Sequence, residues 1–478
     1  MDEELHYLSA TEALARFHSR ALSPVELVEA VIARAEAVEP VVNAFTYTFY
    51  DRALEQAREA QERYARPSGE PRPLEGIPLA LKDEVAVEGW PWENASLTMK
   101  GVVADHTAPV ADRIFASGAV VHARSTTPEF STAGWTHSKL WGTTRNPWNP
   151  EFSPGGSSGG SGASLAAGST TLASGSDIGG SIRIPAAFCG VVGFKPPFGR
   201  NPGDPPWNLD HYCSDGPMGR TVADVALFQN RLAGPHPRDG ASVRPTPVIP
   251  AEPEDIRGWR IAFSPDLGCF DVDPDVASNA AAALDAFREA GATVEEVDLG
   301  WRMDDLRRAA YVHWAGMFVG EISDSPEQRE AFMAYAVDLA DKCAAIAREV
   351  SIYEGLRLEA EISGSLGELL ERFDVLVCPT ATVSGFVAGD DYVGHGYLIG
   401  DAEHRDVDDA FMTYPFNICN RSPVLAVPSG VASNGVPTGI QIVGRTYDDL
   451  SVFRAGAAYE RVRPWSGDHP ELEVESTA

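Results

Sequence analysis

Two glycine–serine clusters and one distant lysine are the residues of this chain best suited to covalent chemistry. The clusters run from Ser153 to Ser161 and from Asp177 to Arg183, and Lys82 lies far upstream at the end of an apolar run. A serine in a glycine-rich turn can present its hydroxyl beside free backbone N–H groups, because glycine lets the backbone approach closely. Nucleophilic attack on a carbonyl carbon needs this combination of nucleophile and oxyanion donors.

The first cluster, taken alone, suggests a different nucleophile. Its Gly-Ser-Ser-Gly-Gly stretch, residues 156–160, matches the G-x-S-x-G elbow of α/β-hydrolases and has Ser158 in the nucleophile position. That interpretation leaves the second Gly-Gly-Ser, which ends at Ser181, unexplained. A flexible glycine–serine linker is a weaker interpretation still, because an apolar segment of ordered character, 182–195, follows the clusters.

Helices and a strand must hold these residues in place. Capping-box patterns at Ser9 and Ser23 predict helices over about residues 9–65, and Pro24 suits a first helical turn. The short apolar run 77–81 predicts a buried strand that ends at Lys82. The lysine is therefore expected at the end of a strand.

The remaining chain alternates between helical and strand patterns. Residues 111–117, 163–167 and 273–290 are predicted as helices, and 119–123, 260–263, 293–297, 374–377 and 424–427 as strands. The strand–helix–strand unit over 260–297 is typical of parallel sheets. The later strands have no separate core around them, so we predict a mixed α/β fold in one large domain, residues 1–478. Its parts are N-terminal helices (about 9–65), a core (about 76–230) and the remainder of the same sheet (about 255–460).

Composition and charge exclude several classes of function. The chain has 69 acidic and 38 basic residues, and its formal net charge of −31 would repel phosphate backbones and anionic lipids. We therefore expect no nucleic-acid partner and no membrane partner. The N-terminus lacks the basic and apolar parts of a signal peptide, which predicts a cytoplasmic protein. The six cysteines show no C-x-x-C spacing and the histidines no H-E-x-x-H spacing, so we expect neither a metal nor another cofactor.

Six segments together make the sequence recognisable. In order and spacing the chain resembles the amidase signature family, from about Ser9 to Tyr459, and its central block is long and specific. The resemblance implies a single α/β domain with a mixed, mostly parallel central sheet covered by helices on both faces. The segments are GIPLALKD (76–83), RNPWN (145–149), GGSSGGS (155–161), SDIGGSIRIP (176–185), GPMGRTVAD (216–224) and GIQIVG (439–444).

The resemblance implies a Ser/Ser/Lys catalytic triad. Ser181 would be the nucleophile, Ser157 a bridging serine with a cis peptide bond, and Lys82 the base. A free lysine, with a pKa of ~10.4, is a poor base at neutral pH, but burial disfavours the charged form. Neutral lysine could then take a proton from Ser157 as that serine takes one from the nucleophile. None of the eleven histidines is required, and His137 and His211 are expected to be surface or packing residues.

Further roles follow from the same resemblance. The backbone N–H groups of Ile178, Gly179, Gly180 and Ser181 would form the oxyanion hole. The hydroxyls of Ser158 and Ser176 would support the proton relay. For Asp83, Asp177 and Arg183 two interpretations stay open: they position the triad, or they pair charges near it.

The substrate pocket is predicted from the loop before the first cluster. In the family this loop lines the cleft, which here suggests an apolar acyl or aryl pocket, although its two aromatic side chains would suit the core equally well. The proline-rich stretch 196–211 departs from the commoner family pattern and would carry Arg200 and Trp207 next to the nucleophile segment. The segment 385–410 is either a lid or a surface loop. The predicted pocket residues are Phe130, Ser131, Thr132, Gly134, Trp135 and Arg200.

Three functions compete. The first is hydrolysis of small amides, anilides or esters, and the second is hydrolysis of carbamates, as in urethanase-type members of the family. The third is a glutaminase-type subunit of a tRNA-dependent amidotransferase, which the strong acidity and the unusual stretch 200–211 argue against. We expect an enzyme that acts on small molecules as a monomer or homodimer.

Overall fold

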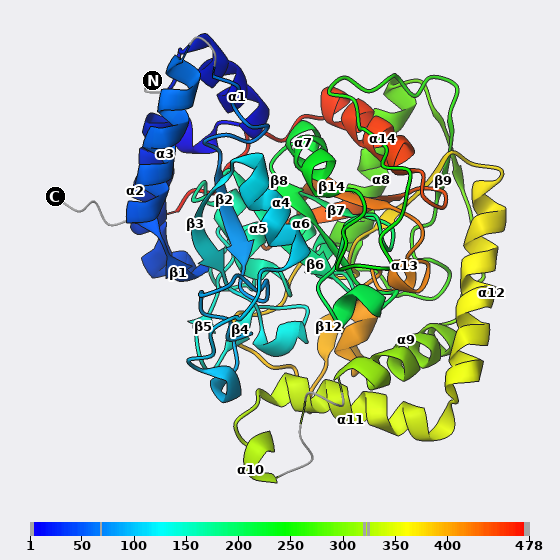
Figure 1. Cartoon of the computed structure of the whole chain (residues 1–478). Helices are drawn as coiled ribbons and strands as arrows, with labels where there is room; N and C mark the ends of the chain where they lie inside the picture. Colours follow the sequence, from blue (N-terminus) through cyan, green and yellow to red (C-terminus); the bar gives the residue numbers. More distant parts are fainter. Residues whose placement is uncertain (1–3, 67–68, 319–321, 323–325, 473–478) are drawn as a thin grey trace.

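One large α/β domain is built on a central sheet of eleven strands (Figure 1). The computed structural model describes residues 4–66, 69–318, 322 and 326–472. The strand order is β1-β3-β2-β6-β8-β7-β14-β15-β11-β9-β10. The strands are β1 (Phe45–Thr48), β2 (Pro78–Lys82), β3 (Val120–Ser125), β6 (Leu172–Asp177), β7 (Val192–Lys195), β8 (Ser214–Gly219), β9 (Arg260–Phe263), β10 (Thr293–Glu296), β11 (Val375–Pro379), β14 (Val424–Val431) and β15 (Pro437–Val443).

The sheet is mixed, and its parallel pairs lie towards its two ends. β3, β2 and β6 run parallel near one end, and β11, β9 and β10 run parallel at the other. The strands between them pair antiparallel, from β6 through β8, β7, β14 and β15 to β11. Two small hairpins, β4–β5 (His137–Ser138 and Gly142–Thr143) and β12–β13 (Tyr397–Ile399 and Ala402–His404), lie outside this sheet.

Helices cover both faces of the sheet. In Figure 1, α1 to α3 stand together beside β1 at one end, and α9, α11 and α12 pack together at the other side of the molecule. The helices are α1 (Ala10–Ser19), α2 (Pro24–Val42), α3 (Tyr50–Ala65), α4 (Pro109–Ser117), α5 (Gly159–Ala166), α6 (Arg183–Cys189), α7 (Val222–Leu232), α8 (Pro274–Glu289), α9 (Met303–Phe318), α10 (Pro326–Arg329), α11 (Ala334–Glu349), α12 (Ile352–Leu370), α13 (Pro415–Ile418) and α14 (Asp449–Val462).

Local signals account for many of these elements. Ser23 accepts a hydrogen bond from the Glu26 N–H, and the Glu26 carboxylate accepts one from the Ser23 N–H, which completes the predicted capping box of α2. The strands predicted at 77–81, 119–123, 260–263, 293–297, 374–377 and 424–427 are confirmed as β2, β3, β9, β10, β11 and β14. The segment 9–65 is not entirely helical, because β1 interrupts it and pairs antiparallel with β3.

Side-chain alternation along β2 decides where Lys82 points. Leu79 and Leu81 belong to the hydrophobic cluster that contains α4, whereas Ala80 belongs to the cluster that contains α5. Successive side chains of a strand point to opposite faces, so Lys82 shares the face of Ala80. The strand therefore directs its last side chain towards the start of α5, where the first glycine–serine cluster lies.

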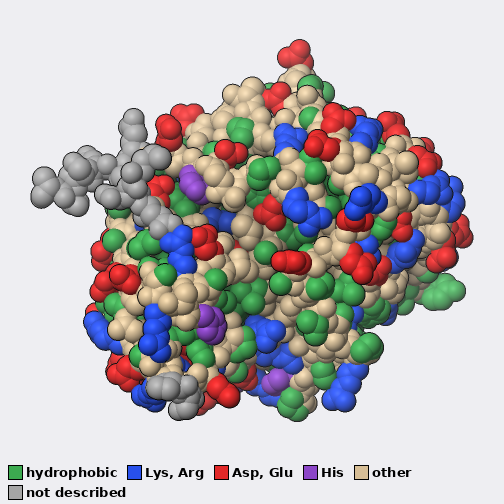
Figure 2. All heavy atoms as spheres, turned by 90° about the horizontal axis from the view of Figure 1, so that it is seen from above, with side chains coloured by type: hydrophobic (Ala, Val, Ile, Leu, Met, Phe, Trp, Pro, Cys, Tyr) green, Lys and Arg blue, Asp and Glu red, His purple; other side chains and the backbone are tan. Residues whose placement is uncertain are grey.

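Charges of both signs are spread over the surface. Figure 2 shows acidic and basic side chains interspersed across one face of the molecule. The net negative charge is therefore not gathered into one patch on this face. Within the described part of the chain, no helix is both long and apolar enough to cross a membrane.

Candidate active site

Lys82 is completely buried, and its ammonium group lies among three oxygen acceptors. Its Nζ donates to Ser157 Oγ at 2.7 Å and to Ser176 Oγ at 2.8 Å. The third acceptor is Glu84 Oε2, at 3.2 Å. An ammonium group has three N–H donors, so this set of contacts satisfies all of them. Lys82 is thereby connected directly to the first glycine–serine cluster.

Glu84 is a site residue that the sequence patterns did not predict. Its carboxylate contacts Lys82 and also accepts a hydrogen bond from the Ser131 hydroxyl. Burial alone would raise the pKa of the Glu84 carboxyl, but the Lys82 charge and the serine hydrogen bonds outweigh burial and hold that pKa below its usual value. A negative charge therefore stands beside the lysine.

Ser157 lies just before α5, where the backbone is tightly enclosed. The Gly156–Ser157 peptide bond is cis, as the family resemblance implied. A Cβ on Gly156 would come within 2.6 Å of the carbonyl oxygens of Ala133 and Trp135, so only glycine fits there. The Ser157 hydroxyl is buried and accepts from Lys82.

Ser181 sits in the turn between β6 and α6. Its carbonyl accepts from the Ser158 N–H at 3.1 Å, which joins the two glycine–serine clusters. Gly180 has φ +129°, and a Cβ there would collide with the Thr413 hydroxyl. In the described residues no hydrogen bond joins the Ser181 and Ser157 hydroxyls, although catalytic hydrogen bonds are often long before substrate binds.

The predicted oxyanion donors are not all free. The Gly180 N–H donates to Asp177 Oδ1 at 2.9 Å, so this donor is already engaged. The N–H groups of Ile178, Gly179 and Ser181 have no hydrogen-bond partner among the described residues. Three N–H groups rather than four therefore remain for an oxyanion beside the Ser181 hydroxyl.

A buried ion pair holds this turn. Asp177 and Arg183 pair through both carboxylate oxygens, at 2.9 and 3.0 Å, and both side chains are inaccessible to solvent. The same carboxylate accepts from the N–H groups of Gly180 and Ile182, on either side of Ser181. Burial is the largest influence on the Asp177 carboxyl and would raise its pKa, but the Arg183 charge and the hydrogen bonds from Arg183 and Asn417 together outweigh burial and hold that pKa below its usual value. The pair therefore positions the residues around Ser181.

The other predicted supporting residues divide into two groups. Ser176 contacts Lys82 directly, whereas the Ser158 hydroxyl contacts the Ser176 backbone, with its N–H at 3.4 Å and its carbonyl at 3.5 Å. Asp83 faces away from the lysine and pairs with Arg124 at 3.2 Å. Of the two interpretations left open for Asp83, its contacts favour pairing of a nearby buried charge over positioning of the predicted triad.

Two cavities lie against the predicted triad serines and share Ser131, Ile178 and Phe318 in their linings. The first, here called the Ser157 cavity, has a volume of about 260 Å³ and is lined by Glu84, Ser157 and Ser176 and by residues of the loop 198–208. The second, here called the Ser181 cavity, measures about 60 Å³ and has mostly apolar walls. Those walls include Trp314, Phe318, Leu339, Phe411 and Tyr414. Phe130, Ser131, Thr132 and Gly134 of the predicted pocket line one or both cavities.

Two predicted pocket residues line neither cavity. Trp135 is buried against Phe386 and Tyr392, so it belongs to the core. Both partners lie in the segment 385–410, so part of this segment packs on Trp135. Arg200 pairs with Asp449 through two contacts of 3.0 Å, which turns its guanidinium away from the cavities. These are corrections to the predicted pocket. Trp207, from the same proline-rich loop as Arg200, does line the Ser157 cavity.

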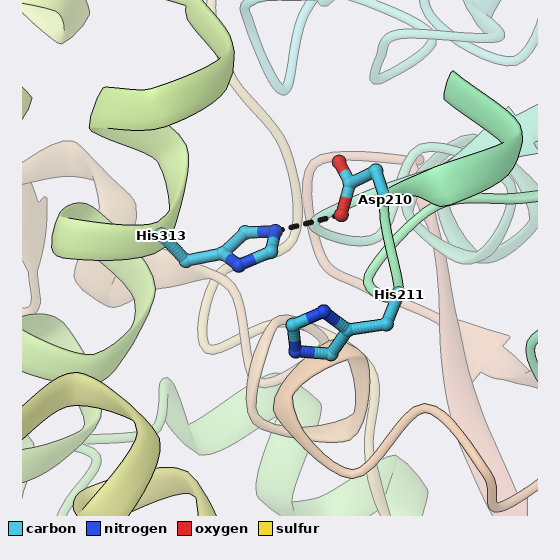
Figure 3. Close-up of side chains that lie close together, drawn as sticks. All are labelled: Asp210, His211 and His313. Carbon is cyan, nitrogen blue, oxygen red and sulfur yellow. Dashed lines mark hydrogen bonds and ion pairs between the residues drawn. The ribbon is translucent and has the colours of Figure 1, made fainter. Parts of the chain in front are cut away.

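A second polar cluster lies near this loop. Asp210, His211 and His313 place one possible ligand atom each within 4.8 Å of one another, so in the described part of the chain they are the residues that could hold a metal ion. Figure 3 shows His313 reaching from α9 to Asp210, with the His211 ring beside it. Each histidine already has a carboxylate partner: His313 contacts Asp210 at 2.6 Å, and His211 contacts Glu359 at 3.0 Å. These contacts fasten the loop to α9 and α12.

Comparison with known proteins gives the family. The family model named Amidase matches residues 26–453. The chain belongs to the amidase family. An acylamidase from Rhodococcus erythropolis is 34% identical over 479 residues, covering 98% of each chain. A glutamyl-tRNA(Gln) amidotransferase subunit from Chloroflexus aggregans is 33% identical over 497 residues, covering 98% of this chain and 99% of the relative.

The solved structures agree with this assignment. A bacterial aryl acylamidase of the amidase signature family has a TM-score of 0.89 and 30% sequence identity, covering 97% of this chain and 98% of that chain. The α/β fold with a mixed central sheet that the sequence predicts is thereby confirmed, although the strands of this sheet pair antiparallel more often than parallel. The protein is a hydrolase of the amidase family that acts on C–N bonds of amides.

Proposed function

We propose that this amidase cleaves acyl amides, including anilides, through an acyl-enzyme formed on Ser181. The observation that carries the proposal is the 2.7 Å hydrogen bond between Lys82 and Ser157. The other glycine–serine cluster holds Ser181, and among the described residues three N–H groups of that cluster have no hydrogen-bond partner. A base, a relay hydroxyl, a nucleophile and oxyanion donors are the parts that acyl transfer requires.

The reaction would proceed in two halves. The reactive form of Lys82 is the neutral amine, so the ammonium form must first lose one proton. The amine then takes the Ser157 proton while Ser157 takes the Ser181 proton, and Ser181 Oγ bonds to the carbonyl carbon. The free N–H groups stabilise the resulting oxyanion. The relay then returns a proton to the departing nitrogen as the C–N bond breaks, which releases the amine. Water, deprotonated through the same relay, cleaves the Ser181 ester and releases the acid.

Glu84 would stabilise the charge that the relay creates. When Lys82 accepts the proton it becomes an ammonium ion, and the Glu84 carboxylate 3.2 Å away attracts that charge. Since the interaction is stronger after proton transfer than before it, it lowers the barrier to attack.

The apolar Ser181 cavity supports an apolar acyl or aryl group on the carbonyl carbon. Aromatic walls such as Trp314 and Phe411 suit such a group. Esters and carbamates present the same carbonyl to the nucleophile, so the proposal extends to both, including a urethanase activity. The test is a substrate series with one acyl group joined through an amide, an ester or a carbamate. Release of aniline from the anilide is expected, and a wild-type enzyme inactive on every anilide would contradict the proposal.

A glutaminase-type component of an amidotransferase is the alternative that the Chloroflexus relative raises. The net charge of −31 opposes a complex that must bind tRNA. We expect the purified chain to hydrolyse amides without a partner, and activity that appears only when a partner protein is added would favour the alternative. Cytoplasmic location and a monomeric or dimeric state stay predictions.

A further inference from the structure

The Ser157 cavity lies on the side of the triad where the amine departs. Ser157, the residue proposed to protonate the leaving nitrogen, lines it, whereas Ser181 lines the other cavity. With the carbonyl carbon on Ser181, the acyl group extends into the Ser181 cavity and the nitrogen substituent into the Ser157 cavity. This step rests on the proposed function.

The polar lining of the Ser157 cavity is rich in acidic side chains, which stand beside serine hydroxyls and asparagine amides. Four carboxylates face it, from Glu84, Asp204, Asp215 and Asp239, and among the described residues that line it there is no lysine, arginine or histidine. Glu84 and Asp239 already have donors, from Lys82 and from the Gly203 backbone respectively. Of the four acidic residues, Asp204 and Asp215 therefore remain as possible acceptors for a ligand.

Asn208 provides an independent sign that a donor is missing. Its side chain is only 8% exposed, and its Nδ2 donates to the Asp239 carboxylate at 3.2 Å. A carboxylate can only accept, so this contact identifies the other amide atom as the oxygen. That oxygen, Oδ1, is buried and has no hydrogen-bond partner in the described part of the chain, and Asn208 is one of the residues that line the cavity. Leaving a buried acceptor unpaired is unfavourable, and a donor on a ligand would satisfy it.

Two carboxyl groups add to this deficit of donors. Asp204 Oδ1 is buried without a partner among the described residues, although its Oδ2 contacts His106 at 2.8 Å. No hydrogen bond to the Asp215 side chain is found in the same part of the chain, and burial, followed by the Glu84 charge, raises the pKa of this carboxyl to about 8. A bound cation would favour the ionised form of Asp215 and supply the attraction that this carboxyl lacks.

We propose that the Ser157 cavity recognises leaving amines that carry a second, basic nitrogen, so that preferred substrates are diamines acylated on one nitrogen. The apolar part of the lining, which includes Trp92, Met99 and Trp207, would contact the spacer between the two nitrogens. The distal ammonium would donate to Asn208 Oδ1 and to the carboxylates of Asp204 and Asp215.

The test compares two leaving amines of the same shape. N-acetyl-4-(aminomethyl)aniline and N-acetyl-4-ethylaniline differ by one ammonium group, and kcat/KM is measured for both. We expect the wild type to prefer the aminomethyl substrate at least tenfold, and Asp215→Asn and Asp204→Asn to reduce that ratio at least threefold each. Asp285→Asn, which changes an exposed carboxylate on α8, is the matched control and should leave the ratio unchanged.

Direct binding separates this proposal from the proposed function. Isothermal titration calorimetry with the free amines 4-(aminomethyl)aniline and 4-ethylaniline needs no turnover. Tighter binding of the first amine, weakened in Asp215→Asn, supports the cavity assignment even if neither anilide is cleaved. Cleavage of both anilides at equal kcat/KM, with equal binding of both amines, would overturn the cavity assignment and leave the proposed amidase function standing.

Discussion

The substitution Asp177→Asn separates positioning of the proposed nucleophile, Ser181, from overall stability. The Asp177 carboxylate accepts five hydrogen bonds, from Gly180, Ile182, Asn417 and two nitrogens of Arg183. The asparagine side chain keeps one acceptor oxygen and replaces the other with an NH₂ group, which cannot accept the hydrogen bonds that the second carboxylate oxygen accepted. Arg183 also loses its buried counter-ion.

The expected cost follows from these contacts. Breaking a buried ion pair destabilises a protein by ~3–5 kcal/mol. For 478 residues the unfolding entropy is ~1 kcal/mol per kelvin, so the melting temperature should fall by ~3–5 °C. Displacement of the turn that carries Ser181 should also lower kcat by ~100-fold, since a misplacement of ~1 Å has that effect. Differential scanning calorimetry and anilide kinetics measure the two effects.

Asp449→Asn is the matched control. Asp449 and Arg200 form another buried bidentate pair, with contacts of 3.0 Å, away from the nucleophile turn. This variant should show a similar drop in melting temperature but keep kcat within about threefold, because no oxyanion donor contacts Asp449. Equal losses of kcat in both variants, or full activity in Asp177→Asn, would refute the positioning role.

Three other substitutions test separate parts of the site. Gly180→Ala should lower kcat by ~100-fold, because the added Cβ collides with Thr413 and shifts the turn that carries the proposed oxyanion donors; steady-state kinetics measure this, and unchanged kcat would contradict it. Glu84→Gln should lower kcat by roughly tenfold, because it removes the carboxylate that stabilises the Lys82 ammonium, and a gain in kcat would exclude that role. Burial, followed by the Arg183 charge, lowers the pKa of Lys195 to about 7. Between about pH 7 and 10 the folded protein therefore binds fewer protons at Lys195 than the unfolded chain does. The unfavourable contribution of Lys195 to the free energy of folding grows as the pH falls through that range. The melting temperature of Lys195→Met minus that of the wild type should therefore increase as the pH is lowered from about 9 to about 6.5 in thermal scans. A difference that stays constant with pH would contradict this prediction.

The sequence predicts the position of the lysine well. A short apolar run indicated the strand that ends at Lys82, and the structure confirms it as β2. The role of Glu84 could have been found from the same pattern, because alternate residues beyond a strand tend to share a side and a carboxylate two residues from a lysine can reach it.

Other features depend on contacts between distant parts of the chain. The antiparallel centre of the sheet joins β7 to β14, segments that no local pattern relates. Arg200 was predicted in the pocket, but its partner Asp449 lies 249 positions further along the chain. The engagement of the Gly180 N–H by Asp177 likewise depends on the folded turn, and glycine content alone could not distinguish three free donors from four.

The central claim is that Ser181 is the nucleophile. The most direct measurement is rapid acid quenching during turnover of 4-nitrophenyl acetate, followed by peptide mass spectrometry. We expect one acetyl group on the peptide that contains Ser181, its absence in Ser181→Ala, and its presence, with slower formation, in Lys82→Ala. An acetyl group on Ser158, or continued turnover by Ser181→Ala, would contradict the account.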